Sequence, residues 1–201
     1  MDSGECNVSG SYQCKDCRRG ISDYCVGEND HDLCSRLAKG GPVHAKYRRM
    51  IVVYMDITAP LYWWKEFDTY KVGTVANSCS TMHKIHSKPF TIDDFSHEHL
   101  KPIAYNKLLD TIGELNFWQD IYNNGGIDKE GNKYKRHDKD AWGQMIQLLP
   151  SSYNQKRTIM ESYEVLANQE FWRHDHKLDE WHTFCDWIKE LPYSELIVKE
   201  K

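Results

Sequence analysis

The chain lacks the basic excess that general nucleic-acid binders and membrane-surface binders normally carry. Its 201 residues include 26 Lys and Arg against 30 Asp and Glu, a formal net charge of −4. No stretch has the apolar length needed to span a bilayer. The N-terminal sequence also lacks the basic start and apolar run of a signal peptide. We therefore expect a cytoplasmic protein that binds neither membranes nor nucleic acids in general.

The composition is otherwise that of a soluble globular protein. Hydrophobic residues make up 40% of the chain and charged residues 28%, and the length suits one domain plus a small appendage. Residues 1–27 are rich in Cys, Gly and Ser and have almost no aliphatic periodicity. The sequence therefore predicts a Cys-rich N-terminal appendage over residues 1–27 and a folded domain over residues 28–201.

The appendage carries four cysteines in a C-x7-C-x2-C-x7-C array: Cys6, Cys14, Cys17 and Cys25. In a reducing cytosol such an array indicates free thiols or a metal rather than disulfides. Four thiolates around one structural zinc would order a segment that has no hydrophobic core of its own. A flexible arm with free thiols is the alternative, and the spacing leaves both open.

Hydrophobic periodicity predicts a mostly helical α+β domain with a small sheet. The β-branched run Ile51-Val52-Val53 predicts a strand over residues 47–57, central because both of its faces are largely apolar. Pro60 is typical of the first turn of a following helix. That helix carries adjacent tryptophans, of which Trp64 is the better core candidate than Trp63. Further helices are predicted at 28–39, 105–122, 141–149, 159–172 and 178–191, a polar connector at 86–102, and a charged surface loop at 128–138.

The stretch from Asp56 to His83 is the most informative part of the chain. It places an aromatic-rich helix before a run of short hydroxyl and amide side chains that includes Asn77, Ser78 and Ser80. A hydrophobic core gains little from such groups. The combination is typical of a surface shaped to fit a polar, planar ligand.

This segment resembles the signature region of the flavin-dependent thymidylate synthases. In that family a strand leads into a helix that ends in Arg-His-Arg, and a motif of the form N-E-x-S-x-R-Y follows. Asn77 and Ser80 match the second motif directly. Ser78, Met82 and His83 stand where the family has Glu, Arg and Tyr.

The resemblance continues in the C-terminal third and covers roughly residues 44–195. Leu149-Pro150, Leu166 and Arg173 follow the family's spacing of a Leu-Pro turn, a helix and an arginine near the helix end. The resemblance implies the family's α+β fold, mostly helical with a small sheet. It also implies a homotetramer with ligand sites at subunit interfaces.

One difference between this sequence and the family, the loss of phosphate-binding arginines, bears on the chemistry. The family transfers a one-carbon unit from a folate to dUMP with hydride from reduced FAD, and several arginines bind the phosphates of both anions. Here the Arg-His-Arg triplet is absent, since residues 67–71 read Phe-Asp-Thr-Tyr-Lys. Because most of the arginines are missing, we expect FAD to bind weakly or not at all. The cations left for an anionic ligand are Lys71, Lys156, Arg157 and Arg173.

The resemblance makes Ser80 the candidate catalytic residue. With Asn77, Ser78 and His83 it would also contact the nucleotide, and Arg173 would hold the phosphate. A second interpretation stays open for each residue. Asn77 and Ser80 are also typical of capped turns, and a cation such as Arg173 at a helix end is favoured by the helix dipole alone.

Two functions therefore remain. The first is an enzyme similar to the flavin-dependent thymidylate synthases, a methyltransferase that acts on a deoxyuridine monophosphate with FAD and folate. The second is a non-catalytic protein that binds a deoxypyrimidine nucleotide, as a sensor or sequestering protein, on the same fold without flavin chemistry. The missing arginines favour the second.

Overall fold

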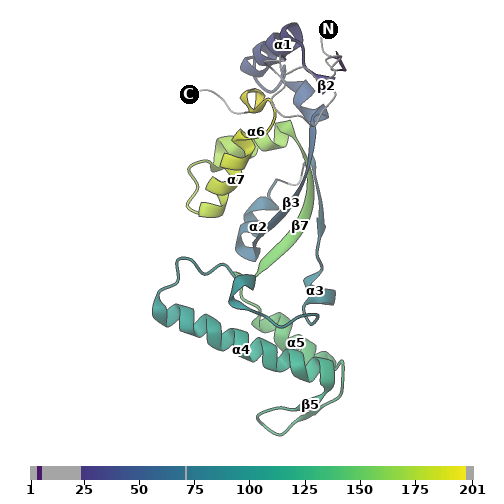
Figure 1. Cartoon of the computed structure of the whole chain (residues 1–201), viewed down its shortest axis with the longest axis vertical. Coiled ribbons are helices and arrows are strands. Elements are labelled where there is room, and N and C mark those ends of the chain that lie inside the picture. Colours follow the sequence, from purple (N-terminus) through teal and green to yellow (C-terminus); the bar gives the residue numbers. More distant parts are fainter. Residues whose placement is uncertain (1–3, 6–23, 71, 198–201) are drawn as a thin grey trace, which may run out of the picture. The chain divides into compact units, whose positions relative to one another are not determined.

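The computed structural model describes residues 4–5, 24–70 and 72–197 and divides into two compact units (Figure 1). The first unit comprises Met1–Tyr54, Tyr70–Thr74 and Met160–Lys201, and the second comprises Met55–Thr69 and Val75–Ile159. The unit boundaries fall inside two long strands, β3 (Val52–Pro60) and β7 (Asn154–Ser162). Each of these strands therefore contributes to both units.

The main sheet has the strand order β3-β7-β4, where β4 is Thr74–Ser78. The predicted strand exists, but the prediction that it is central was wrong, because β7 lies between the other two. Its predicted start is also corrected, since Lys46–Met50 forms the short 3₁₀ helix η1. Alternate β3 side chains such as Tyr54 and Asp56 are exposed, so only one face of this strand is buried.

The first unit contains α1 (Glu28–Lys39), α6 (Tyr163–Arg173), α7 (Asp179–Lys189) and the 3₁₀ helix η3 (Ser194–Leu196). Its short strands β1 (Gly4–Glu5) and β2 (Tyr24–Cys25) pair antiparallel. The bounds of α1 match the prediction, whereas the predicted helix at 159–172 begins only at Tyr163. The core of this unit is formed by Tyr163, Leu166, Trp181, Phe184, Ile188 and Ile197.

The second unit contains α2 (Leu61–Phe67), α3 (Thr81–Lys84), the 3₁₀ helix η2 (Ile92–Asp94), α4 (Pro102–Asn124) and α5 (Lys139–Leu148). The helices α4 and α5 pack against each other, as Figure 1 shows. Leu109 of α4 is an exposed apolar side chain, at 43%. The core of α4, α5 and the connector is formed by Ile85, Phe90, Phe95, Leu108, Ile112, Leu115 and Met145.

Carboxamide side chains of α4 hold the backbone of the predicted polar connector. Asn116 accepts a hydrogen bond from the Phe90 N–H at 2.7 Å and donates one to the Phe90 carbonyl at 2.9 Å. Gln119 donates to the Lys88 carbonyl, and Asn123 donates to the carbonyl of His86. Buried backbone groups need such partners, so these amides fix a segment that has almost no regular structure.

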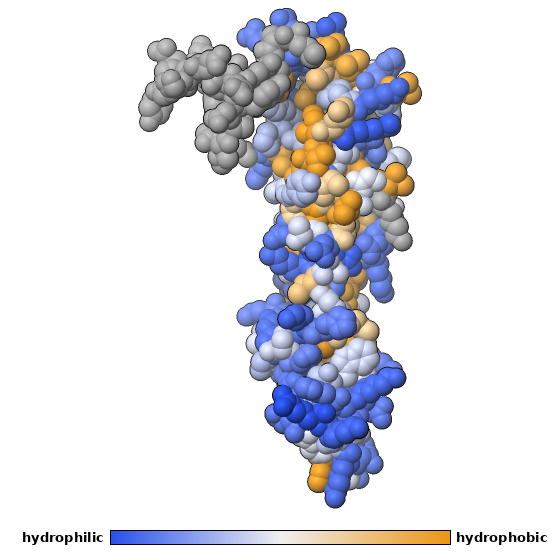
Figure 2. Space-filling model, turned by 90° about the vertical axis from the view of Figure 1, so that its right-hand side faces the viewer, coloured by the Kyte–Doolittle hydropathy of each residue, from blue (hydrophilic) through white to orange (hydrophobic). Residues whose placement is uncertain are grey.

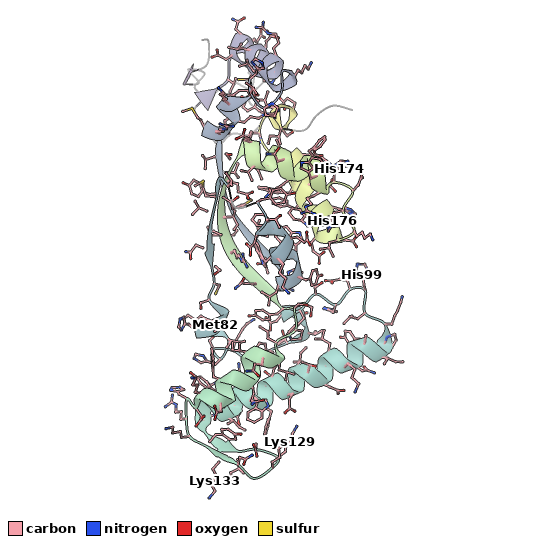
Figure 3. All side chains as sticks on the ribbon, turned by 180° about the vertical axis from the view of Figure 1, so that it is seen from behind. Met82, His99, Lys129, Lys133, His174 and His176 are labelled. Carbon is pink, nitrogen blue, oxygen red and sulfur yellow. The ribbon has the colours of Figure 1, made fainter. Side chains whose placement is uncertain are left out.

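The predicted charged loop closes on one carboxylate. It contains the short antiparallel pair β5 (Gly126–Ile127) and β6 (Lys133–Tyr134). Asp128 accepts hydrogen bonds from the backbone of Glu130 and Asn132, from the Asn132 amide and from the Tyr134 hydroxyl, at 2.8–2.9 Å. These bonds lower the pKa of Asp128 to about 2. The lysines at the tip, including Lys133, lie outside this network (Figure 3).

The zinc hypothesis falls on residues outside the described part of the chain. Cys6, Cys14 and Cys17 are not described, and of Cys25 only the backbone is. Among residues 4–5, 24–70 and 72–197, no group of three or more His, Cys, Asp or Glu side chains is arranged to hold a metal ion. His174 and His176 lie where α6 ends and the following turn begins (Figure 3), and His174 pairs with Asp175 at 3.1 Å.

The described helices include none that combines the length and the apolar character needed to cross a membrane.

We predict that Asp128→Ala frees the β5–β6 hairpin. Amide hydrogen exchange at Glu130 and Asn132 should become faster, because both N–H groups lose their acceptor. In the wild type the same protection should persist above the ordinary carboxyl pKa of 3.8 and disappear as the pH falls through about 2. Glu130→Ala is the matched control and should leave exchange unchanged, because the structure uses only the backbone of Glu130 here.

Candidate functional site

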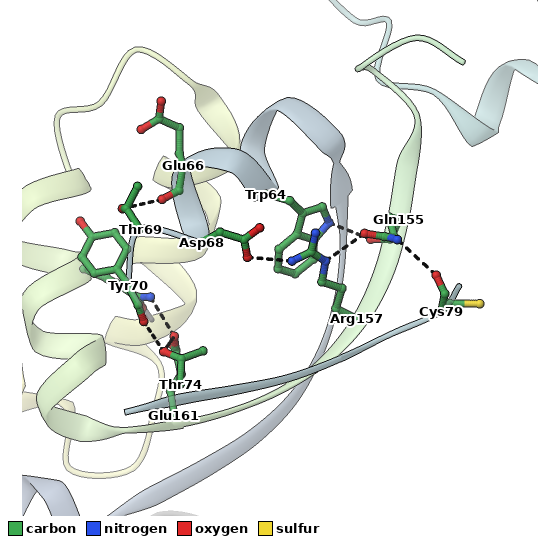
Figure 4. Close-up of polar contacts among 11 residues, drawn as sticks. Trp64, Glu66, Asp68, Thr69, Tyr70, Thr74, Cys79, Gln155, Arg157 and Glu161 are labelled. Carbon is green, nitrogen blue, oxygen red and sulfur yellow. Dashed lines mark hydrogen bonds and ion pairs between the residues drawn. The ribbon is translucent and has the colours of Figure 1, made fainter. Parts of the chain in front are cut away.

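The predicted ligand segment lies in the second unit, on the edge strand β4 and the turn that follows it. Asn77 and Ser78 are exposed on β4. The Cys79 N–H donates to the Lys156 carbonyl at 3.0 Å, and the Gln155 amide donates to the Cys79 carbonyl at 3.2 Å (Figure 4). These bonds attach the segment to β7 and leave the Asn77 and Ser78 side chains available to a ligand.

Ser80 caps the short helix α3. Its Oγ accepts a hydrogen bond from the His83 N–H at 3.3 Å, and its carbonyl accepts one from the Lys84 N–H at 3.0 Å. This is the capped-turn interpretation of the sequence. The described residues offer Ser80 no hydrogen-bonded base, although its hydroxyl proton can still be donated to a ligand. His83 is exposed, and its imidazole makes no hydrogen bond or ion pair with those residues.

Lys156 and Arg157 project from β7 in the second unit, and both are already paired. Lys156 Nζ lies 2.7 Å from Asp56 Oδ2, and both side chains are more than half exposed. The Arg157 guanidinium lies 2.8 Å from Asp68 Oδ1 and only 4.3 Å from the centre of the Trp64 ring (Figure 4). Its Nε also donates to Gln155 Oε1 at 2.9 Å.

Arg157 is therefore part of the packing of α2. Its side chain is only 16% exposed. Trp64 donates its indole N–H to the Gln155 carbonyl, and its ring meets those of Trp63 and Phe67 edge-on, at 4.9 and 5.2 Å. Only Trp64 was predicted to be buried, but Trp63 is equally buried, at 1% exposure. Both fit because α2 is covered on more than one side.

Arg173 ends α6 in the first unit. Its Nε donates to the Tyr70 hydroxyl at 3.0 Å, and its guanidinium lies 5.5 Å from the Tyr70 ring and 5.2 Å from the Trp181 ring. Such contacts hold a guanidinium in one orientation. Lys71, which was predicted to join it, lies outside the described residues.

Glu161 is a buried acid that no sequence motif indicated. Its Oε1 accepts hydrogen bonds from Thr74 Oγ1 at 2.8 Å and Gln169 Nε2 at 2.9 Å, and its Oε2 has no hydrogen-bond partner in the described part. The side chain has no solvent exposure. Burial raises its pKa to about 7, and the two hydrogen bonds oppose that shift. Had β7 been recognised as a strand, the position of Glu161 two residues after Ile159 would have placed this acid on the same buried face of the strand.

A pocket of about 290 Å³ lies within the first unit. Arg48 lines it, and the Arg48 Nε is buried without a hydrogen-bond partner among the described residues. Two carboxylates, Glu164 and Glu170, line it as well, so its polar wall is not suited to a pyrophosphate. The remaining lining residues are Ala38, Gly41, Pro42, Ala45, Ala167, Asn168, Phe171, Trp172 and Ile197.

The predicted site residues divide between the units. Asn77, Ser78, Ser80, His83, Lys156 and Arg157 belong to the second unit and Arg173 to the first. Within the second unit, the Asn77–His83 segment and Lys156 are joined through β4 and β7. Within the first, Arg173, Tyr70, Thr74 and Glu161 form one connected polar network.

Two solved structures resemble this chain over most of its length. Both are crystal structures of the flavin-dependent thymidylate synthase ThyX from Helicobacter pylori with FAD and dUMP. Their TM-scores are 0.58 and 0.56, at 13% sequence identity. Each similarity covers 85% of this chain and 83% or 81% of the other. The chain has the flavin-dependent thymidylate synthase fold.

The thymidylate synthase fold confirms both the α+β class predicted from periodicity and the resemblance to this family. No protein-family model matches the sequence, and no curated protein matches it. At 13% identity the agreement concerns the path of the backbone, so the side-chain chemistry has to be judged from this chain's own residues.

We predict that Arg157→Ala destabilises the thymidylate synthase-like domain by about 1–3 kcal/mol, because it removes a buried cation–π contact and leaves Asp68 and Gln155 without their donor. Lys156→Ala, one position away, should change the free energy of unfolding by less than about 0.5 kcal/mol, because its ion pair is exposed. Urea denaturation measures both. Equal effects would contradict the structural role of Arg157.

Proposed function

We propose that the chain binds a deoxypyrimidine monophosphate such as dUMP. The observation that carries the proposal is the guanidinium of Arg173, which lies over two aromatic rings at the end of α6, in a chain whose fold matches proteins crystallised with dUMP. In this role Arg173 binds the phosphate through charge-assisted hydrogen bonds. Asn77 and Ser80 contact the base or the sugar, and Ser78 and His83 complete the exposed polar surface around them.

Two forms of this function are proposed. In the first, the protein is a thymidylate synthase-like methyltransferase that uses FAD and a folate, with Ser80 in contact with the reacting pyrimidine. In the second it binds the nucleotide without flavin chemistry, as a sensor or sequestering protein. The second is supported by the ion pairs of Lys156 and Arg157 and by the absence of a described base beside Ser80. The residues present do not suit the FAD pyrophosphate, because the Arg-His-Arg triplet is absent and Lys156 and Arg157 are paired with carboxylates.

We also propose that the protein is cytoplasmic and works as a homotetramer. The first unit exposes large apolar side chains, among them Met50 at 86%, Val52 at 44% and Val72 at 93%. Figure 2 shows hydrophobic side chains gathered over this unit. Exposed apolar groups of this extent are typical of interfaces. In such an assembly the ligand sites combine residues of neighbouring copies.

We predict that dUMP, dTMP or dCMP binds in calorimetric titrations and that Arg173→Ala weakens the binding roughly ten- to a hundredfold, a loss of about 1.5–3 kcal/mol. Ser80→Ala should cost less, about 0.5–1.5 kcal/mol, because a neutral hydroxyl exchanges its hydrogen bond with water more evenly.

Arg173→Lys is the control for these titrations, since it keeps the charge and loses the forked geometry. Circular dichroism should show each variant folded. Undetectable binding of all three nucleotides at millimolar concentration would refute the nucleotide site, as would an unchanged affinity in Arg173→Ala.

We predict that FAD binds weakly or not at all. Each missing charge-assisted hydrogen bond to the pyrophosphate should cost about 1.5–3 kcal/mol. Absorbance of the purified, dialysed protein in the flavin region measures this. One flavin per chain would contradict the prediction and restore the enzyme as the better form of the proposed function.

A further inference from the structure

One hydroxyl proton in the first unit has two acceptors. Thr74 Oγ1 lies 2.6 Å from the Tyr70 carbonyl oxygen and 2.8 Å from Glu161 Oε1 (Figure 4). A threonine hydroxyl carries a single proton, so it can donate to only one of them at a time. The choice depends on which acceptor is stronger, and that depends on the charge of Glu161.

The same network leads to Arg173. Thr74 holds the backbone of Tyr70, and the hydroxyl of Tyr70 accepts a hydrogen bond from Arg173 Nε at 3.0 Å. Gln169, the other partner of Glu161, lies on α6 one turn before Arg173. Glu161 is therefore connected to Arg173 indirectly by two routes. One runs through the hydrogen bonds of Thr74 and Tyr70, and the other runs through Gln169 along α6.

We propose that Glu161 is a positioning residue whose protonation state sets the orientation of Arg173, and that it thereby makes binding of a nucleotide phosphate depend on pH. This inference rests on the proposed function, in which Arg173 binds the phosphate. Glu161 itself contacts no ligand.

In the protonated state the carboxyl group is neutral. The Thr74 proton then goes to the Tyr70 carbonyl, and the Tyr70 hydroxyl supports the guanidinium. When Glu161 loses its proton, the carboxylate becomes the stronger acceptor and draws the Thr74 hydroxyl away. The Tyr70 carbonyl loses its donor, and Arg173 loses part of its support.

The surroundings of Glu161 place this change near neutral pH. It is faced by Thr74 from β4 and by Gln169 from α6, neither of which titrates. Burial raises the pKa of Glu161 to about 7, and no charged side chain of the described residues contributes to that shift. The titratable groups of the network are the Tyr70 hydroxyl and the Arg173 guanidinium. Two other titratable groups, Glu170 on α6 and Cys185 on α7, interact with each other. His174 and His176 follow Arg173 in the sequence.

The first test observes Arg173 without a ligand. The Nε–H resonance of Arg173 in ¹⁵N-arginine-labelled protein is assigned by its loss in Arg173→Lys and is followed from pH 5.5 to 8.5. In the wild type it should shift with a midpoint near 7, and in Glu161→Gln it should not. His174 and His176 are present in both proteins, so any contribution from them is common to both. The same shift in both proteins, or none in the wild type, would overturn the proposal.

The second test measures dUMP affinity at pH 6 and pH 8. Relative to Glu161→Gln, the wild type should lose about tenfold in affinity as the pH rises, whereas the titration of the phosphate itself is common to both proteins. Thr74→Val lacks the shared proton and should hold Arg173 in its high-pH state at every pH. A pH dependence that is equal in the wild type and Glu161→Gln would refute the coupling.

The two tests separate the two proposals. If no variant binds dUMP at either pH, the proposed function fails, and the resonance of Arg173 alone decides whether Glu161 positions it. If dUMP binds but the resonance does not respond to Glu161, the nucleotide site stands and the positioning role is wrong.

Discussion

The central strand β7 buries two ionisable side chains, one in its charged form and one in its neutral form. In the second unit Arg157 keeps its charge, because Asp68 neutralises it and the Trp64 ring covers it. In the first unit Glu161 has no counter-ion among the described residues, and burial favours its neutral form. The charge of Arg157 is therefore fixed by ion pairing, whereas the charge of Glu161 remains sensitive to its surroundings.

This division decides which cations can serve a ligand. A guanidinium that already pairs with a carboxylate must give up that partner before it binds a phosphate, and the exchange gains little. Arg157 is in this position. The contacts of Arg173 described above are of another kind, two aromatic rings and a hydroxyl, and they fix the orientation of its guanidinium.

Local patterns predicted the helices well, because their ends carry Gly or Pro and their apolar residues recur at helical spacing. The same patterns predicted the α+β class, and the resemblance at Asn77, Ser80 and Arg173 predicted the particular fold. The strand β7 was missed because polar residues dominate its first half, and only pairing on both sides makes it a strand. The partners of Glu161 and Arg173 lie far away in the sequence, so no local pattern could reveal them.

The carboxamide side chains of α4 bind the backbone of the connector that precedes this helix. Asn116 bonds both backbone groups of Phe90, as a neighbouring strand would. This loop is therefore part of the helix's own folding unit, despite its irregular backbone. Insertions and circular permutation, which usually succeed in irregular segments, should fail between His86 and Phe90, where regular structure is absent but the backbone of His86, Lys88 and Phe90 is bonded to α4.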